Sequence, residues 1–299
     1  MPLIGYKIIR LHLAQATHAA ILGLALLVMT GPARSDEAAP DKSQYTYLNA
    51  TPADKLRSFS PDRPAKSTGP FTIDAGHWQY ELDFFNYTYQ RTGPVRTTTW
   101  TGPNPTLKAG LTTNIDIEAN FAPYVNIATR DSSAGTKSVA DGAGDLFVRA
   151  KINLWGNDGG KTAAALIPYI KAPTAADGVG NGATEGGVIA ALSISLPNDA
   201  SLTLNSEVDS LQNGSGSGYH ANYVNVAGIS MPLMKDVTVT GEFWSSINDD
   251  PAGVVRQYSI DGAIAWTVKP NVQLDAGVNI GLNSDTPDVQ VYAGLAQRF

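Results

Sequence analysis

Charged residues recur at every second position in several segments of this 299-residue chain. Between residues 145 and 155, Asp145, Arg149 and Lys151 occupy odd positions, while every even position is apolar. Side chains two residues apart on a β-strand point to the same side, so these charges would line one face. A row of charges on one face can hold ions or polar solutes by electrostatic contact. Binding or selection of a solute is therefore one function that this spacing allows.

The same spacing places charged side chains on one face of other segments, and acids outnumber bases among them. Two interpretations stay open: the charges pair with one another and keep the face hydrated, or some of them select a solute in transit. The predicted inward-facing residues are Glu81, Asp83, Lys108, Asp116, Glu118, Asp145, Arg149, Lys151, Glu207, Asp209, Glu242, Asp261, Asp275 and Arg298.

Catalytic and metal-binding patterns are weak by comparison. A nucleophilic serine needs a histidine base nearby, and beyond residue 35 the histidines are His77 and His220, neither of which has such a partner in the sequence. Glycine-rich residues 178–187 precede no helix, and residues 141–145 have too few oxygen ligands for calcium. There is no cysteine. We therefore predict no enzyme activity, no catalytic residue, no cofactor and no metal site.

Twelve segments have the alternation expected of β-strands. Most are long enough for the roughly 9 to 11 residues that a tilted strand needs to cross a bilayer. The predicted strands cover residues 76–90, 104–111, 114–125, 144–156, 162–171, 186–196, 201–211, 219–232, 237–248, 255–268, 272–283 and 288–299.

The connections between these segments alternate between two kinds. Tight turns are predicted near residues 112–113, 157–160, 197–200, 234–236 and 269–271, and longer Gly-, Ser-, Thr- and Pro-rich loops at 91–103, 126–143, 172–185, 212–218, 249–254 and 284–287. Short periplasmic turns with longer outer loops are typical of outer-membrane barrels. A soluble β-sandwich is the competing fold, but its outward face should be polar. We therefore predict an all-β fold, a transmembrane antiparallel up-and-down β-barrel of about 12 strands.

The beginning of the sequence predicts export. Residues 1–35 combine Lys7 and Arg10 with an apolar stretch at 19–29 and small residues at Ala33 and Ser35, as a signal peptide does. That stretch is well short of the roughly 20 residues of a spanning helix. Removing residues 1–35 removes three basic residues and no acid, so the net charge becomes 18 minus 27, or −9. Such an acidic chain is a poor candidate for binding nucleic acid.

Residues 36–75 have no strand pattern. This segment carries basic side chains next to a face that is predicted to be acid-rich, so electrostatic attraction could hold it in the pore mouth as a plug. The alternative, which stays open, is a solvated periplasmic tail. The plug candidates are Lys55, Arg57, Asp62, Arg63 and Lys66. We expect residues 76–299 to form the barrel.

Aromatic residues lie near strand ends, where Trp and Tyr commonly form girdles at the membrane interface. They are Trp78, Tyr80, Phe84, Phe85, Tyr87, Tyr89, Trp155, Trp244, Tyr258, Trp266 and Tyr292. Phe85 or Trp244 could instead contact a ring-shaped solute in the lumen. The chain ends on an aromatic residue, Phe299, which we interpret as a barrel-assembly signal at the end of the last strand.

Several motifs together resemble the family named "Putative MetA-pathway of phenol degradation". They are Asp-Arg-Pro at residues 62–64, Gly-x-Gly-Asp at 142–145 followed by Lys151, Leu-Asp-x-Gly at 274–277, and the terminal Arg-Phe. Family members usually have an acidic residue after Arg-Pro, whereas Ala65-Lys66 stands here.

The resemblance implies an outer-membrane transporter in a Gram-negative cell. The expected function is a channel for small solutes, with phenolic or other aromatic compounds as candidates. A structural or lipid-handling barrel without solute transport is the alternative. Expected partners are outer-membrane lipid, a small-molecule solute and the barrel-assembly machinery.

Overall fold

The structure is a computed structural model that describes residues 41–299. The predicted signal peptide lies outside these residues. The described strands are β1 (Trp78–Thr92), β2 (Val95–Thr101), β3 (Asn104–Gly110), β4 (Ile115–Phe121), β5 (Val125–Asp131), β6 (Thr136–Gly142), β7 (Leu146–Trp155), β8 (Thr162–Ala172), β9 (Glu185–Ser195), β10 (Ser201–Gln212), β11 (Tyr219–Met234), β12 (Val237–Asn248), β13 (Val255–Lys269), β14 (Val272–Gly281) and β15 (Val289–Arg298).

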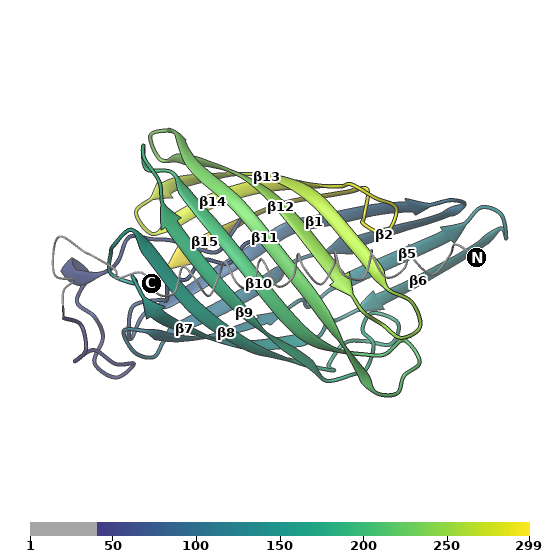
Figure 1. Cartoon of the computed structure of the whole chain (residues 1–299), viewed down its shortest axis with the longest axis horizontal. Coiled ribbons are helices and arrows are strands. Elements are labelled where there is room, and N and C mark those ends of the chain that lie inside the picture. Colours follow the sequence, from purple (N-terminus) through teal and green to yellow (C-terminus); the bar gives the residue numbers. More distant parts are fainter. Residues whose placement is uncertain (1–40) are drawn as a thin grey trace, which may run out of the picture.

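Twelve of these strands close into one antiparallel barrel (Figure 1). Their order around the ring is β1, β3, β4, β7 and then β8 to β15, and β15 pairs with β1 to close it, with Gln79 opposite Arg298. Closure matters because an open sheet edge would leave backbone N–H and C=O groups unpaired in lipid. The prediction of a transmembrane barrel of about twelve strands is confirmed.

The strands β2, β5 and β6 lie outside this ring order and continue the sheet past one end of the barrel (Figure 1). The C-terminal half of β1, from Asn86 to Thr92, pairs with β2. In turn, β2 pairs with β5, and β5 pairs with β6. Residues 91–103 and 126–143 were predicted as loops, and this prediction is wrong for most of both stretches. Beyond the bilayer both faces of a sheet can be polar, so the apolar alternation that identifies a membrane strand is missing.

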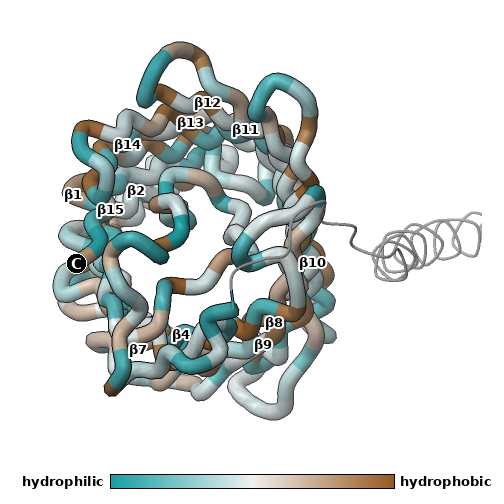
Figure 2. Tube along the Cα trace, turned by 90° about the vertical axis from the view of Figure 1, so that its left-hand side faces the viewer, coloured by the Kyte–Doolittle hydropathy of each residue, from teal (hydrophilic) through white to brown (hydrophobic). Residues whose placement is uncertain are grey.

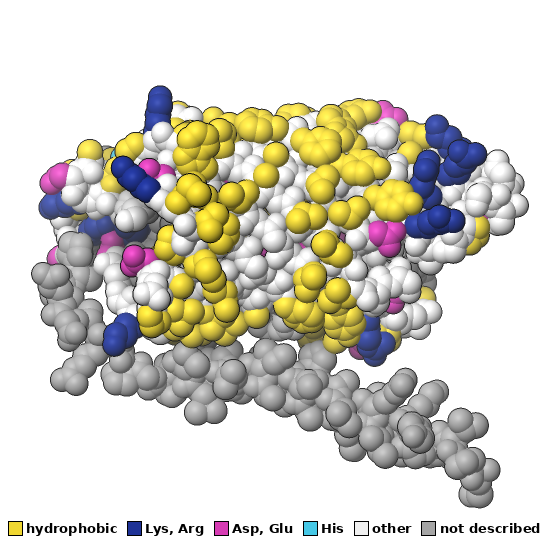
Figure 3. All heavy atoms as spheres, turned by 90° about the horizontal axis from the view of Figure 1, so that it is seen from above, with side chains coloured by type: hydrophobic (Ala, Val, Ile, Leu, Met, Phe, Trp, Pro, Cys, Tyr) yellow, Lys and Arg dark blue, Asp and Glu magenta, His cyan; other side chains and the backbone are white. Residues whose placement is uncertain are grey.

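The two faces of the barrel differ in composition. Large apolar side chains are exposed on the outside, among them Phe84, Leu107, Ile170, Ile229 and Ile264. Figure 3 shows hydrophobic side chains over the middle of the molecule and charged ones toward both ends. Polar and charged side chains of the same strands are buried. This is the split expected when lipid surrounds a strand that has a polar side within.

Residues 41–77 precede the barrel strands. Their first part lies at one end of the barrel (purple in Figure 1), and residues 62–73 contact the inner wall, where Figure 2 shows chain within the ring. They contain one short 3-10 helix, Ala53–Lys55. The segment hydrogen-bonds to strands all around the ring, including β1, β7, β10, β12 and β14. No helix among residues 41–299 is long and apolar enough to cross a membrane. We call residues 41–77 the inner segment.

Candidate functional site: the barrel interior and the inner segment

Arg63 of the inner segment lies between two acids of the barrel wall. Its guanidinium forms an ion pair with Asp83 of β1, and Nη2 lies 2.6 Å from Asp275 Oδ1 of β14. Asp275 is buried, and the Arg63 side chain is only 14% exposed. A Cβ at Gly294 would collide with the Arg63 guanidinium. The absence of a side chain at this wall position therefore makes room for the ion pair.

Asp62, the residue before it, makes the reverse arrangement. Its carboxylate accepts hydrogen bonds from Lys108 of β3 and Lys151 of β7, the latter at 2.8 Å. The side chains of both lysines are about 97% buried. Lys108 also lies 2.6 Å from Glu81, and Lys151 lies 3.5 Å from Glu118. The only acid among the five plug candidates thus contacts two cations of the wall.

Two wall glutamates hold the backbone of the inner segment. The Glu81 carboxylate accepts hydrogen bonds from the amides of Asp62 and Arg63, at 3.2 and 3.0 Å. The Glu242 carboxylate accepts hydrogen bonds from the amides of Lys66 and Ser67, at 2.7 and 3.1 Å. Charged acceptors form the stronger class of hydrogen bond. These acids therefore bind the inner segment and are not free for a solute.

Lys66 reaches a different part of the wall. Its Nζ lies 3.3 Å from Asp261 Oδ1, donates to Ser259 and lies 4.4 Å from the ring centre of Trp244. An ammonium group over an indole ring is a favourable cation–π contact. Trp244 therefore points into the lumen, which is the alternative to a place in the girdle at the membrane interface. Two residues after Lys66, the Thr68 amide donates to Asn205 of β10 at 2.7 Å.

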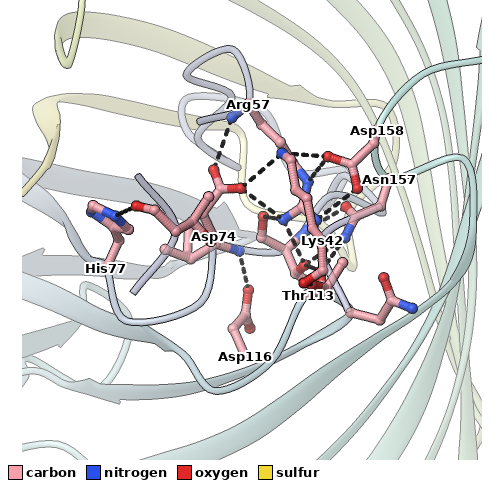
Figure 4. A network of polar contacts seen from close by, with 12 residues as sticks. Lys42, Arg57, Asp74, His77, Thr113, Asp116, Asn157 and Asp158 are labelled. Carbon is pink, nitrogen blue, oxygen red and sulfur yellow. Dashed lines mark hydrogen bonds and ion pairs between the residues drawn. The ribbon is translucent and has the colours of Figure 1, made fainter. Parts of the chain in front are cut away.

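A second polar network fixes the inner segment at the end of the barrel that holds the short turns and the C-terminus (Figure 4). We call this the periplasmic end, because short turns face the periplasm in outer-membrane barrels. Arg57 Nε donates to Asp158 at 2.9 Å, and Lys42 Nζ lies 2.6 Å from the same carboxylate. Asp158 belongs to the turn between β7 and β8. Within the segment, Asp74 contacts both Lys42 and Arg57, and its side chain is buried. Burial raises the pKa of Asp158, but hydrogen bonds from Arg57 and Lys42 lower it more, so the pKa lies below its ordinary value.

A cavity lies beside this network at the periplasmic end. It has a volume of about 620 Å³ and is lined by the inner segment, the β7–β8 turn and the wall residues Gln79 and Arg298. The Arg298 guanidinium donates to the Arg57 carbonyl at 2.8 Å. Ile73 N donates to Asp116 of β4 at 2.8 Å. Asp116 and Arg298 thus contact the same segment as the glutamates.

Lys55 is the plug candidate that the structure does not bring to the wall. Its Nζ donates to Tyr45 of the same segment at 3.1 Å, and the side chain is exposed. Arg57, Asp62, Arg63 and Lys66 do contact barrel residues.

A third group of predicted residues lies nearer the extracellular end and does not touch the inner segment. Lys171 pairs there with Asp145 at 3.0 Å and with Glu185 at 2.8 Å. Tyr169 and Asn222 donate to the two oxygens of Asp209. Glu207 and Arg149 lie on strands β10 and β7 beside this group, and Arg149 Nε has no hydrogen-bond partner among the described residues. Asp145 and Asp209 are thus paired with side chains of the barrel wall and not with the inner segment.

Sequence reasoning missed several residues that hold the inner segment. Asp74, Asp158 and Lys42 lie in stretches without strand alternation, so no pattern assigned them a direction. Asn205 and Ser259 are neutral, and the search for inward-facing charges passed over them. Tyr292 was placed in the aromatic girdle, and that placement is wrong, because the side chain is 9% exposed and donates to the Pro64 carbonyl at 2.8 Å. Its position between Val291 and Ala293 on an alternating strand was the available signal.

The sequence comparison identifies the family. The model described as "Putative MetA-pathway of phenol degradation" matches residues 61–299. The chain belongs to this family. Three of the motifs that carry the resemblance meet inside the barrel: Asp62 contacts Lys151, and Arg63 contacts Asp275. A search of curated proteins found no significant match.

Solved structures share the fold. An outer membrane channel from Pseudomonas putida F1 aligns with a TM-score of 0.56 and 13% identity, covering 75% of this chain and 94% of that one. The NanC porin aligns at 0.47 with 11% identity, covering 72% and 98%. The translocator domain of the autotransporter NalP from Neisseria meningitidis aligns at 0.45 with 13% identity, covering 80% and 90%. Of these three, only the Pseudomonas channel has a TM-score above 0.5. At 13% identity this likeness shows the fold alone, which is that of an outer-membrane barrel.

Proposed function

We propose that the protein is an outer-membrane channel for small solutes, and that the inner segment is its plug. The observation that supports this most is the pairing of Asp62, Arg63 and Lys66 with buried wall charges of opposite sign. A solvated tail would need none of these partners. A buried charge pair recovers its desolvation cost only where the geometry is good, so a tail that enters the barrel by chance would not be expected to satisfy them.

The proposed channel conducts when the plug leaves its partners. Removing the plug would free Asp83, Asp261 and Asp275 to face water and ions. Acidic rings favour cations over anions in pores. The plugged state therefore keeps the pore small and its charges neutralised, while the open state offers an acid-rich path for cations and neutral polar solutes.

Liposome swelling and planar-bilayer current test the channel itself. We expect the double variant R63Q/K66Q to pass more solute than the wild type, because two anchors of the plug are lost. K55Q is the matched control, since it removes a cation of the same segment that does not contact the wall. Absence of current from wild type and R63Q/K66Q alike, with the barrel folded, would favour a structural or lipid-handling barrel.

For the solute class we propose phenolic or other small aromatic compounds. The family description names phenol degradation, and the Trp244 ring faces inward under Lys66. When Lys66 leaves, this ring offers a stacking surface. We expect catechol to interrupt the current of R63Q/K66Q, and W244A in that background to shorten these interruptions. W266A is the control, since Trp266 is 53% exposed on the outside. Equal interruptions in all three proteins would rule out Trp244 as the contact.

For membrane insertion we propose that the terminal Phe299 is read by the barrel-assembly machinery. Phe299 is 62% exposed and stacks on Tyr80 with ring centres 5.7 Å apart. F299A should slow assembly into the outer membrane, measured as the fraction of folded barrel after a pulse of synthesis. Y80A removes the stacking partner and keeps the terminal ring. Equal slowing by both variants would assign Phe299 a packing role instead.

A further inference from the structure

Four cations form a row across the extracellular extension of the barrel. In the strand register, Arg91 of β1 is opposite Arg96 of β2, Arg96 is opposite Arg130 of β5, and Arg130 is opposite Lys137 of β6. Neighbouring strands lie about 4.8 Å apart, so the row spans about 14 Å. We call these four residues the cation row.

The cation row faces away from the lumen. On β1, Arg91 alternates with Tyr89 and Tyr87, while Asn86 on the other side bonds to Gln290 within the barrel. All four cations are exposed. Two shallow hollows lie between them. One of about 220 Å³ is lined in part by Arg91, Arg96 and Arg130, and one of about 120 Å³ in part by Arg96, Arg130 and Lys137. Figure 3 shows basic side chains gathered at this end of the molecule.

No described acid neutralises the row. Among residues 41–299, none of the four cations takes part in an ion pair within 4 Å. The Asp131 carboxylate is occupied by the turn amides of Ser133 and Ala134, and Asp288 accepts from the Arg91 backbone. Asp141 shares the face of Lys137 but is four residues along β6, or about 13 Å away. Like charges directly opposite one another destabilise a sheet, so the row has a cost in folding free energy that an anionic ligand would offset.

The position of the row indicates which anion is available. The periplasmic end holds the short turns and the C-terminus, so the extension lies on the extracellular side. The outward rings Tyr87, Tyr89 and Trp100 lie just below the row, and such rings commonly sit at the headgroup level. Arg91 is two residues beyond Tyr89, or about 7 Å. The row therefore meets the polar part of the outer leaflet.

We propose that the cation row binds phosphate groups of the outer-leaflet lipid, lipopolysaccharide. Arginine forks bind phosphate oxygens in pairs, and three of the four cations are arginines. A span of about 14 Å accommodates more than one phosphate. Because the row faces outward and not into the pore, this binding is independent of solute transport and would orient and anchor the extension at the surface.

The test measures binding of lipid A to the purified mature protein in detergent. We expect R96Q/R130Q to bind lipid A roughly 25-fold more weakly than wild type, at about fivefold for each cation lost. R256Q is the matched control, because Arg256 is a single exposed cation at the extracellular end of β13. It should change binding little. Retention of the heat-modifiable folded band in gels shows that the variants are folded.

Two further arms identify the ligand. Dephosphorylated lipid A should bind wild type and R96Q/R130Q equally weakly, and millimolar inorganic phosphate should not displace lipid A from the wild type. The proposal is overturned if the double variant binds lipid A as well as wild type does. It is also overturned if the wild type binds dephosphorylated lipid A as well as it binds lipid A. A third overturning result is that millimolar inorganic phosphate displaces lipid A from the wild type.

Discussion

Charges inside the barrel and charges on its extracellular extension are arranged in opposite ways. Inside, Asp62 meets lysines, and Arg63 and Lys66 meet acids. On the extension, cations stand opposite cations, from Arg91 to Lys137. An interior that satisfies its own charges has no need of a ligand, whereas a row of like charges does. The first arrangement therefore suggests a closed, internally held state, and the second a surface that another molecule completes.

The largest expected effect comes from breaking the interior arrangement at Asp62. D62N leaves Lys108 and Lys151 without the carboxylate between them, and removing one partner of a buried ion pair costs about 3 kcal/mol or more. We expect trypsin to cut after Arg57 or Lys66 roughly a hundredfold faster, because local opening limits cleavage. D54N, an exposed acid of the same segment, is the control. Equal cleavage of D62N and wild type would mean that the pairing does not hold the segment.

A smaller effect is expected when one cation of the interior is removed. R63Q leaves Asp83 and Asp275 without their guanidinium partner, so their charges act on ions in the pore. The reversal potential in a salt gradient should shift in the cation-selective direction. K55Q should leave it unchanged. A shift toward anions would contradict the assignment of these acids to the conducting path.

Acid should loosen the periplasmic network in a defined pH window. The pKa of Asp158 is lowered in the folded protein, so its contribution to stability is present above the ordinary value of 3.8 and is lost as the pH falls through the folded pKa. Hydrogen exchange of residues 55–58, corrected for intrinsic rates, should lose protection below about pH 4. D158N should show low protection already at neutral pH. Protection that is independent of both pH and D158N would refute the role of this anchor.

The smallest effect concerns the cation row in the absence of lipid phosphate. R96Q/R130Q removes like charges that stand opposite one another, so the protein should become about 0.5 kcal/mol more stable to urea in a phosphate-free detergent. R256Q should be neutral. A loss of stability in R96Q/R130Q would show that these arginines have a structural partner, and the contrast between interior and extension would fail.

Alternation predicted the barrel strands because lipid imposes an apolar outer face on them. The last strand is an example: Val289, Val291, Ala293 and Leu295 lie outside, and Tyr292 and Ala296 are buried. The same rule could not find β2, because its Thr-rich sequence Val95–Thr101 lies where lipid imposes no such face. Local pattern thus predicts strands only as far as the membrane reaches.

The predicted site divides along a similar line. The direction of charges such as Lys108 and Asp275 followed from strand period, since each side chain lies two residues from an inward neighbour. Which of them would meet Asp62 or Arg63 could not be predicted, because these contacts join residues 46 and 212 positions apart and depend on how the barrel closes. The like-charge row on the extension was hidden for the same reason, as it arises only from the register between four strands.

The most direct test of the account is the single-channel conductance of the protein without its plug. Deleting residues 36–70 removes Asp62, Arg63 and Lys66 and leaves every barrel strand intact. The account predicts a stable, cation-preferring conductance well above that of the full mature chain, with the deletion variant still folded. An unchanged conductance in the folded deletion variant would contradict it, and would mean that the inner segment does not obstruct the pore.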